Sequence, residues 1–207
     1  MVYYGSPVFA TENEFQQWST LNIGVRLNDL YTFNFLTQGR FAVSDDRADQ
    51  YVFRPSLHRK LANSLVAGIG IDYLKLDPGN PEQRTWQEIS YGSKFGHFNL
   101  KQRFRFEQRF LEDIKPIYRA RYNMKAVYPL PDSRWSVVTF NEIFFNLNSR
   151  GRGPAPGFDQ NRLFAGFGLD VTADTRVESG YLWRYLSRRD MENIHDHAVA
   201  IFIYLNL

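Results

Sequence analysis

The sequence predicts an all-β protein that forms a single transmembrane antiparallel up-and-down β-barrel, and three observations support this prediction. Apolar and polar residues alternate strictly over most of the chain, as in strands, where successive side chains point to opposite faces. Short and long links alternate between these stretches, as in outer-membrane barrels. Glycines such as Gly68 and Gly166 lie on the charged face, whereas the large aromatic residues lie on the apolar face, which favours an apolar exterior.

The clearest alternation runs from Phe98 to Tyr128. One face reads Phe98, Leu100, Gln102, Phe104, Phe106, Gln108 and Phe110, then Tyr118, Ala120, Tyr122, Met124, Ala126 and Tyr128. The other reads Asn99, Lys101, Arg103, Arg105, Glu107 and Arg109, then Arg119, Arg121, Asn123 and Lys125. A half-exposed sheet of a soluble protein alternates in the same way. This stretch alone therefore does not distinguish a soluble sheet from a membrane barrel, and the pattern of the whole chain is needed.

The first five stretches cover residues 15–27, 31–41, 51–61, 65–73 and 86–95. Their apolar faces are Phe15, Leu21, Ile23, Val25 and Leu27; Tyr31, Phe33, Phe35 and Phe41; Tyr51, Phe53, Pro55, Leu57 and Leu61; Leu65, Ala67, Ile69, Ile71 and Tyr73; and Ile89, Tyr91 and Phe95. Asn28-Asp29 predicts a tight hairpin turn. The segment 77–84 is rich in loop-forming residues and predicts a longer link.

The remaining six stretches cover residues 98–110, 118–128, 135–146, 160–169, 176–185 and 199–207. After Tyr128 their apolar faces are Trp135, Val137, Ile143 and Phe145; Leu163, Ala165, Phe167 and Leu169; Val177, Tyr181, Trp183 and Tyr185; and Val199, Ile201, Ile203, Leu205 and Leu207. Phe140 and Phe144 interrupt the polar face of their stretch. The sequence therefore shows eleven strands, with no amphipathic helix between them.

The links predict the topology of the barrel. The short links are 28–29, 62–63, 96–97, 129–133 and 170–174, and the long links are 43–49, 77–84, 111–116, 148–157 and 187–194. We interpret them as short periplasmic turns and longer extracellular loops. Because single-chain bacterial barrels have even strand numbers, we expect twelve strands, with the twelfth from residues 2–11.

Composition bounds the class of protein. At 207 residues the chain fits one domain, 1–207, in which 1–13 forms a leading strand or N-terminal segment. A mean hydropathy of −0.43 is compatible with a barrel that has a polar lumen. The absence of cysteine excludes disulfides and cysteine metal sites. Val2-Tyr3-Tyr4 follows Met1 without the features of a signal peptide, so the chain is either cytoplasmic or a mature outer-membrane protein.

Several short motifs resemble those of the outer-membrane barrel family named domain of unknown function 2490. The most specific is Arg103-Phe-Arg-Phe-Glu-Gln-Arg109. The others are Trp18, Arg54 before Pro55, Trp86 with Glu88, Tyr118-Arg-Ala-Arg-Tyr122, Asn141-Glu142, Asn161-Arg162, Gly180-Tyr181 and His197. The resemblance extends from Trp18 to the C-terminus, and it implies a barrel in the outer membrane of a Gram-negative bacterium without implying an activity. The chain ends in Leu207, where the C-terminal assembly signal of barrels usually has Phe.

The charged face would line the lumen of such a barrel. Its cations are Arg26, Arg40, Arg54, Lys60, Lys94, Lys101, Arg103, Arg105, Arg109, Arg119, Arg121, Lys125, Arg162, Arg176 and Arg184. Its anions are Asp72, Glu88, Glu107, Glu142, Glu178 and Asp196. This excess of arginine predicts a small, porin-like channel for anionic solutes. The alternative is a lumen closed by arginine–glutamate networks, since buried charges require partners.

Eight residues are the candidates for the lumen site: Arg103, Arg105, Arg109, Arg119, Arg121, Glu107, Glu142 and Arg162. Among them, Arg105 and Arg119 are predicted to contact the solute, and Glu107 and Glu142 to organise the arginines around them. The alternative function is a non-conducting barrel that acts as a structural partner of envelope proteins or as a lipid-modifying enzyme. Outer-membrane lipid is the expected surrounding in either case.

Other chemistry has weaker support in the sequence. His195 and His197 lie two residues apart and would share a face of a strand, but two ligands do not form a metal site. A barrel hydrolase would need a triad such as Ser187, one of these histidines, and Glu192 or Asn193, and no nucleophile elbow is present. We predict no catalytic residues, no metal, no cofactor and no nucleic-acid partner.

Overall fold

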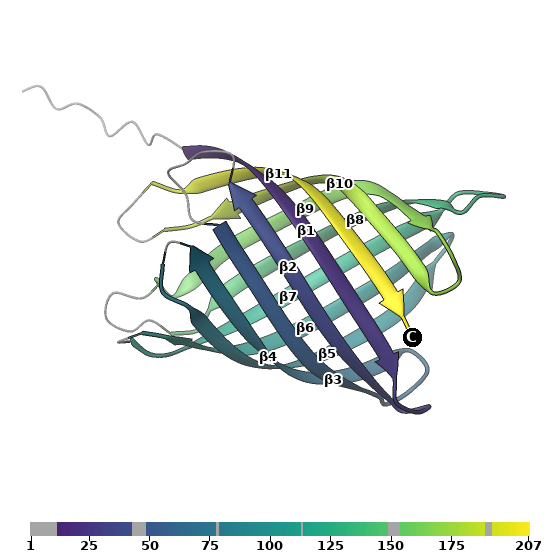
Figure 1. The fold of residues 1–207 in the computed structure, drawn as a ribbon, viewed down its shortest axis with the longest axis horizontal. Helices are drawn as coiled ribbons and strands as arrows, with labels where there is room; N and C mark the ends of the chain where they lie inside the picture. The colour runs from purple at the N-terminus through teal and green to yellow at the C-terminus, as the bar shows by residue number, and fades with distance from the viewer. Residues whose placement is uncertain (1–11, 43–48, 78, 113, 149–153, 189–191) are drawn as a thin grey trace, which may run out of the picture.

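The structure is a computed structural model that describes residues 12–42, 49–77, 79–112, 114–148, 154–188 and 192–207. In these ranges the chain forms a closed β-barrel (Figure 1). Its strands are β1 (Glu12–Arg26), β2 (Tyr31–Ala42), β3 (Asp49–Lys60), β4 (Leu65–Asp77), β5 (Glu82–Phe95), β6 (Phe98–Leu111), β7 (Ile114–Pro129), β8 (Trp135–Asn146), β9 (Gly157–Asp170), β10 (Thr175–Leu186) and β11 (Ile194–Asn206). The predicted all-β barrel is confirmed. No helix in the described residues has the length and hydropathy needed to cross a membrane.

Each strand pairs antiparallel with the next, and β1 closes the barrel by pairing parallel with β11. The seam extends from Glu12 opposite Ile194 to Gly24 opposite Asn206, and the purple and yellow strands of Figure 1 lie side by side along it. Eleven strands close this barrel in the described residues, whereas twelve strands were expected. A meander of eleven antiparallel strands has its first and last strands in the same direction, so its closing pair must be parallel. Residues 2–11, from which the twelfth strand was expected, lie outside the described residues.

The links predicted to be short join strands at one end of the barrel, which we call the turn rim, and those predicted to be long join strands at the other end, the loop rim. The predicted links 77–84 and 111–116 are too long. The strand β4 continues to Asp77 and β5 already begins at Glu82, while β6 continues to Leu111 and β7 begins at Ile114. Glu82, Arg84, Trp86 and Glu88 continue a single inward face, and proline and glycine in the segment before Glu82 obscured this alternation. Part of the predicted long link 148–157 lies outside the described residues.

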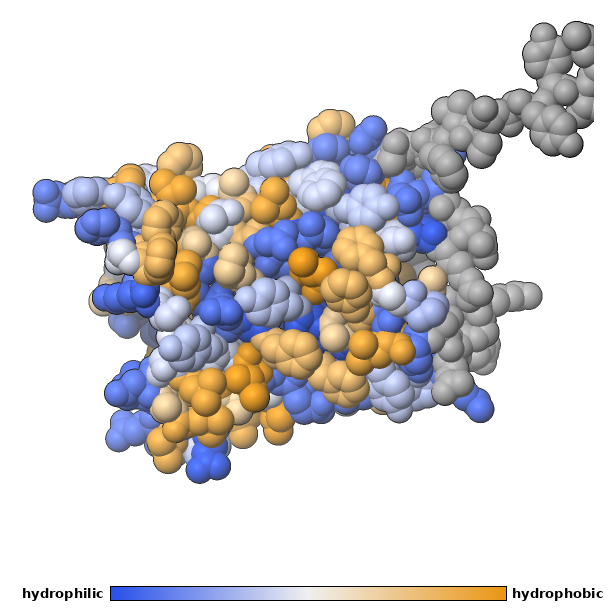
Figure 2. Space-filling model, turned by 180° about the vertical axis from the view of Figure 1, so that it is seen from behind, coloured by the Kyte–Doolittle hydropathy of each residue, from blue (hydrophilic) through white to orange (hydrophobic). Residues whose placement is uncertain are grey.

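The exterior of the barrel is apolar. Outward side chains such as Ile69, Phe95 and Val199 are 58%, 74% and 61% exposed, and apolar residues cover much of the visible face in Figure 2, with hydrophilic residues interspersed among them. Aromatic side chains cluster near both rims. Phe158 contacts Phe145 and Tyr185 near the loop rim, and Tyr128 contacts Phe98 near the turn rim. This is the arrangement of a barrel that crosses a lipid bilayer.

Glycines make room for large side chains inside the barrel. Gly70 lies opposite Trp86 in the β4–β5 register, and a Cβ atom on Gly70 would collide with the Trp86 indole. Gly166 and Gly180 face each other across β9 and β10, where a Cβ atom on either would collide with the backbone of the opposite strand. The inward position of the Trp86 ring and the close approach of β9 and β10 therefore require glycine at these positions.

A bulge breaks the alternation between β8 and β9. Phe144 pairs with Gln160 and Phe145 pairs with Phe158, so Asp159 is an extra residue on β9. Both Asp159 and Gln160 are buried as a result. Strict alternation would have placed only one of them inside, whereas bulges re-aim side chains in this way.

Candidate functional site in the barrel lumen

Glu107 on β6 is the centre of an ion-pair network on the inner surface. Its side chain has no exposed surface, and one carboxylate oxygen accepts hydrogen bonds from Arg119 Nη2 at 2.5 Å and Nε at 2.9 Å. Arg121 donates a short hydrogen bond to the other oxygen. Glu107 lies opposite Arg119, and Arg105 lies opposite Arg121, so all four side chains share the inner face. Two guanidinium groups thus balance one carboxylate that is fully removed from water.

Glu142 on β8 extends the network across the next strands. Its Oε1 accepts hydrogen bonds from Arg103 Nη2 at 2.7 Å and from Arg121 Nη2 at 2.8 Å. Arg162 Nη1 on β9 lies 3.6 Å from the other oxygen. The network therefore runs without a break from β6 to β9, with Arg121 shared between Glu107 and Glu142.

Two smaller groups lie nearer the loop rim. Glu82 at the start of β5 accepts hydrogen bonds from Arg84 Nε at 2.6 Å and from Arg109 Nε at 2.5 Å. Asp159, which the bulge turns inward, accepts from Asn146 Nδ2 at 2.9 Å and lies 3.2 Å from Arg119 Nη1. Each carboxylate at this end therefore anchors at least one arginine.

Trp86 joins the network to the neighbouring strands β3 and β4. Its Nε1 donates to Asp72 at 2.7 Å, and Asp72 accepts two parallel hydrogen bonds from Arg54, both at 2.7 Å. The Arg105 guanidinium lies 3.7 Å from the centroid of the Trp86 ring and 2.6 Å from Glu88. This combination of stacking and ion pairing holds Arg105 away from water.

Two adjoining cavities occupy the lumen. One, of about 260 Å³, extends toward the turn rim and is called the turn-side cavity. The other, of about 410 Å³, extends toward the loop rim and is called the loop-side cavity. Arg40, Arg84 and Arg162, from β2, β5 and β9, line both, so these three side chains form the boundary between the cavities.

The linings of the two cavities are strongly cationic. Their basic residues are Arg40, Arg54, Arg84, Lys101, Arg103, Arg109, Arg119, Arg121, Lys125, Arg162, Arg184 and Arg188, and their acidic residues are Glu82, Glu142 and Asp159. The other carboxylates of the network, such as Glu107, lie behind the surface of the cavities. Positive groups are therefore the ones that a solute in the lumen would contact first.

Arg40 and Lys101 have no carboxylate within 4 Å among the described residues. Arg40 donates to the amide oxygens of Gln38 at 2.7 Å and Gln50 at 3.1 Å, and its guanidinium lies 4.2 Å from the centroid of the Trp18 ring. Lys101 is exposed in the turn-side cavity. Within the described part of the chain, no ion pair neutralises the charge of these two side chains.

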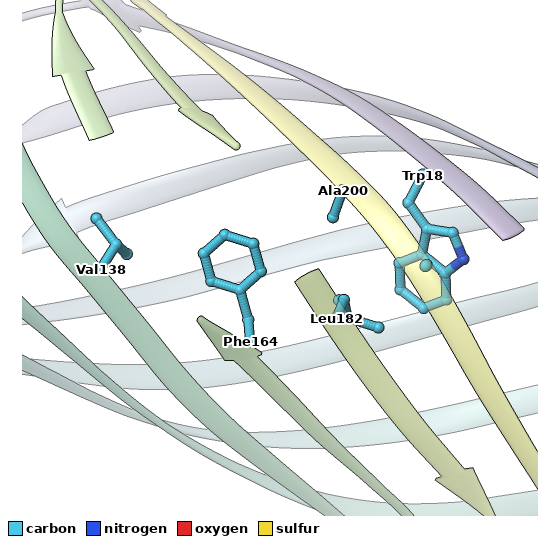
Figure 3. Close-up of a cluster of buried hydrophobic side chains, with 6 residues drawn as sticks. Trp18, Val138, Phe164, Leu182 and Ala200 are labelled. Atoms are coloured by element: carbon cyan, nitrogen blue, oxygen red, sulfur yellow. The ribbon is translucent and has the colours of Figure 1, made fainter. Parts of the chain in front are cut away.

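Another part of the inner surface is apolar. Buried side chains from β1 and from β8 to β11 form a continuous cluster (Figure 3). Its members are Trp18, Val138, Phe164, Leu182, Ala198 and Ala200. Phe140 stacks on Phe164 with ring centroids 5.1 Å apart, and Phe202 meets Phe164 edge-on at 5.4 Å.

Trp18 lies where the two sides of the lumen meet. Across the parallel seam it lies opposite Ala200, and this small side chain leaves room for the indole. The guanidinium groups of Arg40, Arg162 and Arg184 lie 4.2, 5.1 and 5.5 Å from its ring centroid. An aromatic face attracts cations, so one residue belongs to the apolar cluster and also holds three arginines of the cavities.

Comparison with known proteins agrees with this architecture. The family described as "Protein of unknown function (DUF2490)" matches residues 15–195. The chain belongs to this family. It is also similar to an uncharacterised protein of Methylorubrum extorquens, with 31% identity over 180 residues that cover 81% of this chain and 77% of the relative. Among solved structures, the NanC porin aligns with a TM-score of 0.58 over 93% of this chain and 97% of the porin, at 9% identity, which is a likeness of fold alone.

The residues predicted for the lumen of this DUF2490 protein fall into three groups. Arg103, Arg121, Glu142 and Arg162 line the turn-side cavity, and Arg109, Arg119 and Arg162 line the loop-side cavity. Arg105 and Glu107 are 2% and 0% exposed and line neither cavity. Of the two side chains predicted to contact a solute, Arg119 thus lies on a cavity wall, and Arg105 lies behind one.

Sequence reasoning missed Arg84, Asp159 and the apolar cluster. Arg84 was assigned to a link, although alternation with Trp86 and Glu88 could have placed it on the inner face. Asp159 depends on a bulge that has no clear mark in the sequence. The presence of Phe140 and Phe144 on a polar face was the signal for an apolar region inside the barrel.

His195 and His197 lie apart from the lumen. Tyr181 Oη is 2.5 Å from His197 Nδ1, and Trp183 Nε1 donates to His195 Nδ1 at 3.3 Å, all on the outward face of β10 and β11. Asp196 points inward instead and pairs with Arg184. Ser187 lines the loop-side cavity, so the strand separates it from both histidines, and this arrangement does not assemble the triad considered above.

Proposed function

We propose that this DUF2490 protein is a narrow channel for small anions in the outer membrane of a Gram-negative bacterium. The observation that carries the proposal is the lining of the two adjoining lumen cavities, in which Lys and Arg far outnumber Asp and Glu. Arginines around a narrow polar path favour anions over cations, and low-dielectric walls strengthen that effect. Arg40, Arg84 and Arg162 are the side chains that a permeating ion would have to pass.

The exterior supports the location. Apolar side chains face outward along every strand, and aromatic side chains cluster at both rims. The likeness of fold to a porin supports the same placement. We propose outer-membrane lipid as the surrounding of the barrel, with the turn rim toward the periplasm and the loop rim toward the outside.

A second candidate is a non-conducting barrel that serves as a structural partner of envelope proteins or modifies lipid. The observation in its favour is the buried network itself, since Glu107 and the two arginines that it binds fill part of the lumen. Under the channel proposal the same network makes the path narrow, and a low conductance is expected.

The test is a recording from the purified protein in a planar lipid bilayer with a potassium chloride gradient. We expect a small conductance and a reversal potential that favours chloride. Arg40→Gln should reduce the chloride selectivity and move the reversal potential toward zero, because Arg40 is a boundary cation with no carboxylate within 4 Å among the described residues. For the same reason its removal leaves no described carboxylate without its partner. Arg119→Ala would instead remove an ion-pair partner from Glu107 and Asp159. A changed current could then result either from the lost charge or from a less stable barrel.

Arg59→Gln is the matched control. Arg59 is an exposed arginine on the outward face of β3, 5.7 Å from the Tyr31 ring, and it lines neither lumen cavity. Its removal should leave the reversal potential unchanged. A folded barrel that passes no current, or that prefers potassium, would reject the channel and favour the second candidate.

A further inference from the structure

The turn-side cavity has two chemically different walls. Lys101 and Arg103 on β6 line one side, and Leu36, Phe140 and Phe202 line another. Phe140 and Phe202 are only partly buried and pack edge-on at 6.1 Å, so each ring keeps surface that faces the cavity. A small inorganic anion would satisfy the cationic wall and leave this apolar wall in contact with water.

The cationic wall has unused capacity for an acceptor. Lys101 is exposed in the cavity and has no carboxylate within 4 Å in the described part of the chain. Arg103 donates through Nη2 to Glu142, and its buried Nε lies 3.8 Å from Glu88, but 25% of its side chain is exposed and it lines the cavity. Glu142 is the acidic residue of this lining, and its carboxylate already faces Arg103, Arg121 and Arg162. A carboxylate brought by a ligand would therefore meet the Lys101 ammonium and the exposed part of the Arg103 guanidinium.

We infer that the turn-side cavity binds small amphipathic anions, in which a carboxylate is attached to an aromatic ring. The carboxylate would bind Lys101 and Arg103, and the ring would pack on Phe140 and Phe202. The volume of about 260 Å³ lies just below the range of roughly 300–1,000 Å³ that holds drug-sized ligands, which limits the ligand to a small one. This inference deepens the proposed channel and rests on it only for the route by which the ligand reaches the cavity.

Calorimetric titration of the barrel in lipid nanodiscs tests the inference without requiring conduction. The probes are phenylacetate, acetate, which lacks the ring, and phenylacetamide, which lacks the charge. We expect phenylacetate to bind, and both other probes to bind at least about tenfold more weakly, because each loses one wall. Equal affinity for phenylacetate and acetate, or for phenylacetate and phenylacetamide, would overturn the inference.

Two variants test which wall of the cavity binds the carboxylate and which binds the ring. Lys101→Gln should weaken phenylacetate about tenfold through loss of a charge-assisted hydrogen bond, and Phe202→Leu, which keeps an apolar side chain, should weaken it about threefold through loss of ring packing. Lys75→Gln is the control, because Lys75 is an exposed lysine 3.8 Å from Asp77 at the loop rim, and its loss should change nothing. Leu36→Ala replaces Phe202→Leu if circular dichroism shows that the latter misfolds.

The result is separable from that of the channel experiment. Phenylacetate binding that depends on Lys101 in a barrel without conductance would support the site and reject the channel. Chloride conductance in a barrel that binds acetate and phenylacetate alike would support the channel and reject the site. If well-folded Lys101→Gln and Phe202→Leu both bind phenylacetate as the wild type does, the site is not where we place it.

Discussion

The two sides of the lumen bury their side chains equally well but by opposite means. Glu107 in the ion-pair network around β6 and β7, here called the charged wall, and Phe164 in the apolar cluster, here called the apolar wall, are both 0% exposed. Glu107 is held by hydrogen bonds from Arg119 and Arg121, whereas Phe164 is held by ring contacts with Phe140 and Phe202. The difference shows that the charged wall depends on specific partners, because an unpaired buried charge is costly, and the apolar wall depends on filled volume.

The largest effect is expected from Glu107→Gln on the charged wall. The substitution leaves Arg119 and Arg121 buried with a neutral partner, and loss of one member of a buried pair costs about 3–5 kcal/mol. We expect the free energy of unfolding to fall by about 4 kcal/mol in urea titrations with lipid vesicles, followed by tryptophan fluorescence. Glu112→Gln is the control, because Glu112 is exposed in the link after β6. Equal stability of the two variants would mean that the pairs around Glu107 do not hold the wall.

A smaller effect is expected from Phe164→Ala on the apolar wall. Removal of a buried aromatic ring costs about 3 kcal/mol through lost transfer free energy and the cavity that remains. Phe164→Leu should recover at least half of this loss in the same urea titration, because the wall requires volume and no particular partner. If the leucine variant were as unstable as the alanine variant, the wall would depend on ring geometry, and the contrast with the charged wall would be weaker.

The smallest effect is expected from Gly180→Ala. The new Cβ atom would collide with Gly166 Cα and with the Ala165 carbonyl across β9, and overpacking of this kind costs about 2 kcal/mol. Gly92→Ala on β5 is the matched control, since a Cβ atom there has nothing within 4 Å, and it should leave the urea midpoint unchanged or raise it. A neutral Gly180→Ala would show that β9 and β10 can separate enough to accept the methyl group.

Local pattern determined much of the fold. Alternation is a property of neighbouring residues, so it identified the strands and assigned Phe104 and Arg105, for example, to opposite faces. The order of the links along the chain separated the two rims, because consecutive links of an antiparallel meander lie at opposite ends, although the links 77–84 and 111–116 are shorter than predicted. Arg103, Arg119 and Arg121 could be chosen as lumen candidates because each lies on the charged face of a clear strand.

Only the tertiary structure decided how the barrel closes and which inward residues meet. The parallel β1–β11 seam depends on the strand number that closes the sheet, and alternation along one strand carries no information on that number. The inward turn of Asp159 depends on a bulge that the register across β8 and β9 creates. Arg40, Arg84 and Arg162 meet at the boundary between the cavities because closure brings together strands that are far apart in the chain, and no local spacing encodes a contact across a lumen.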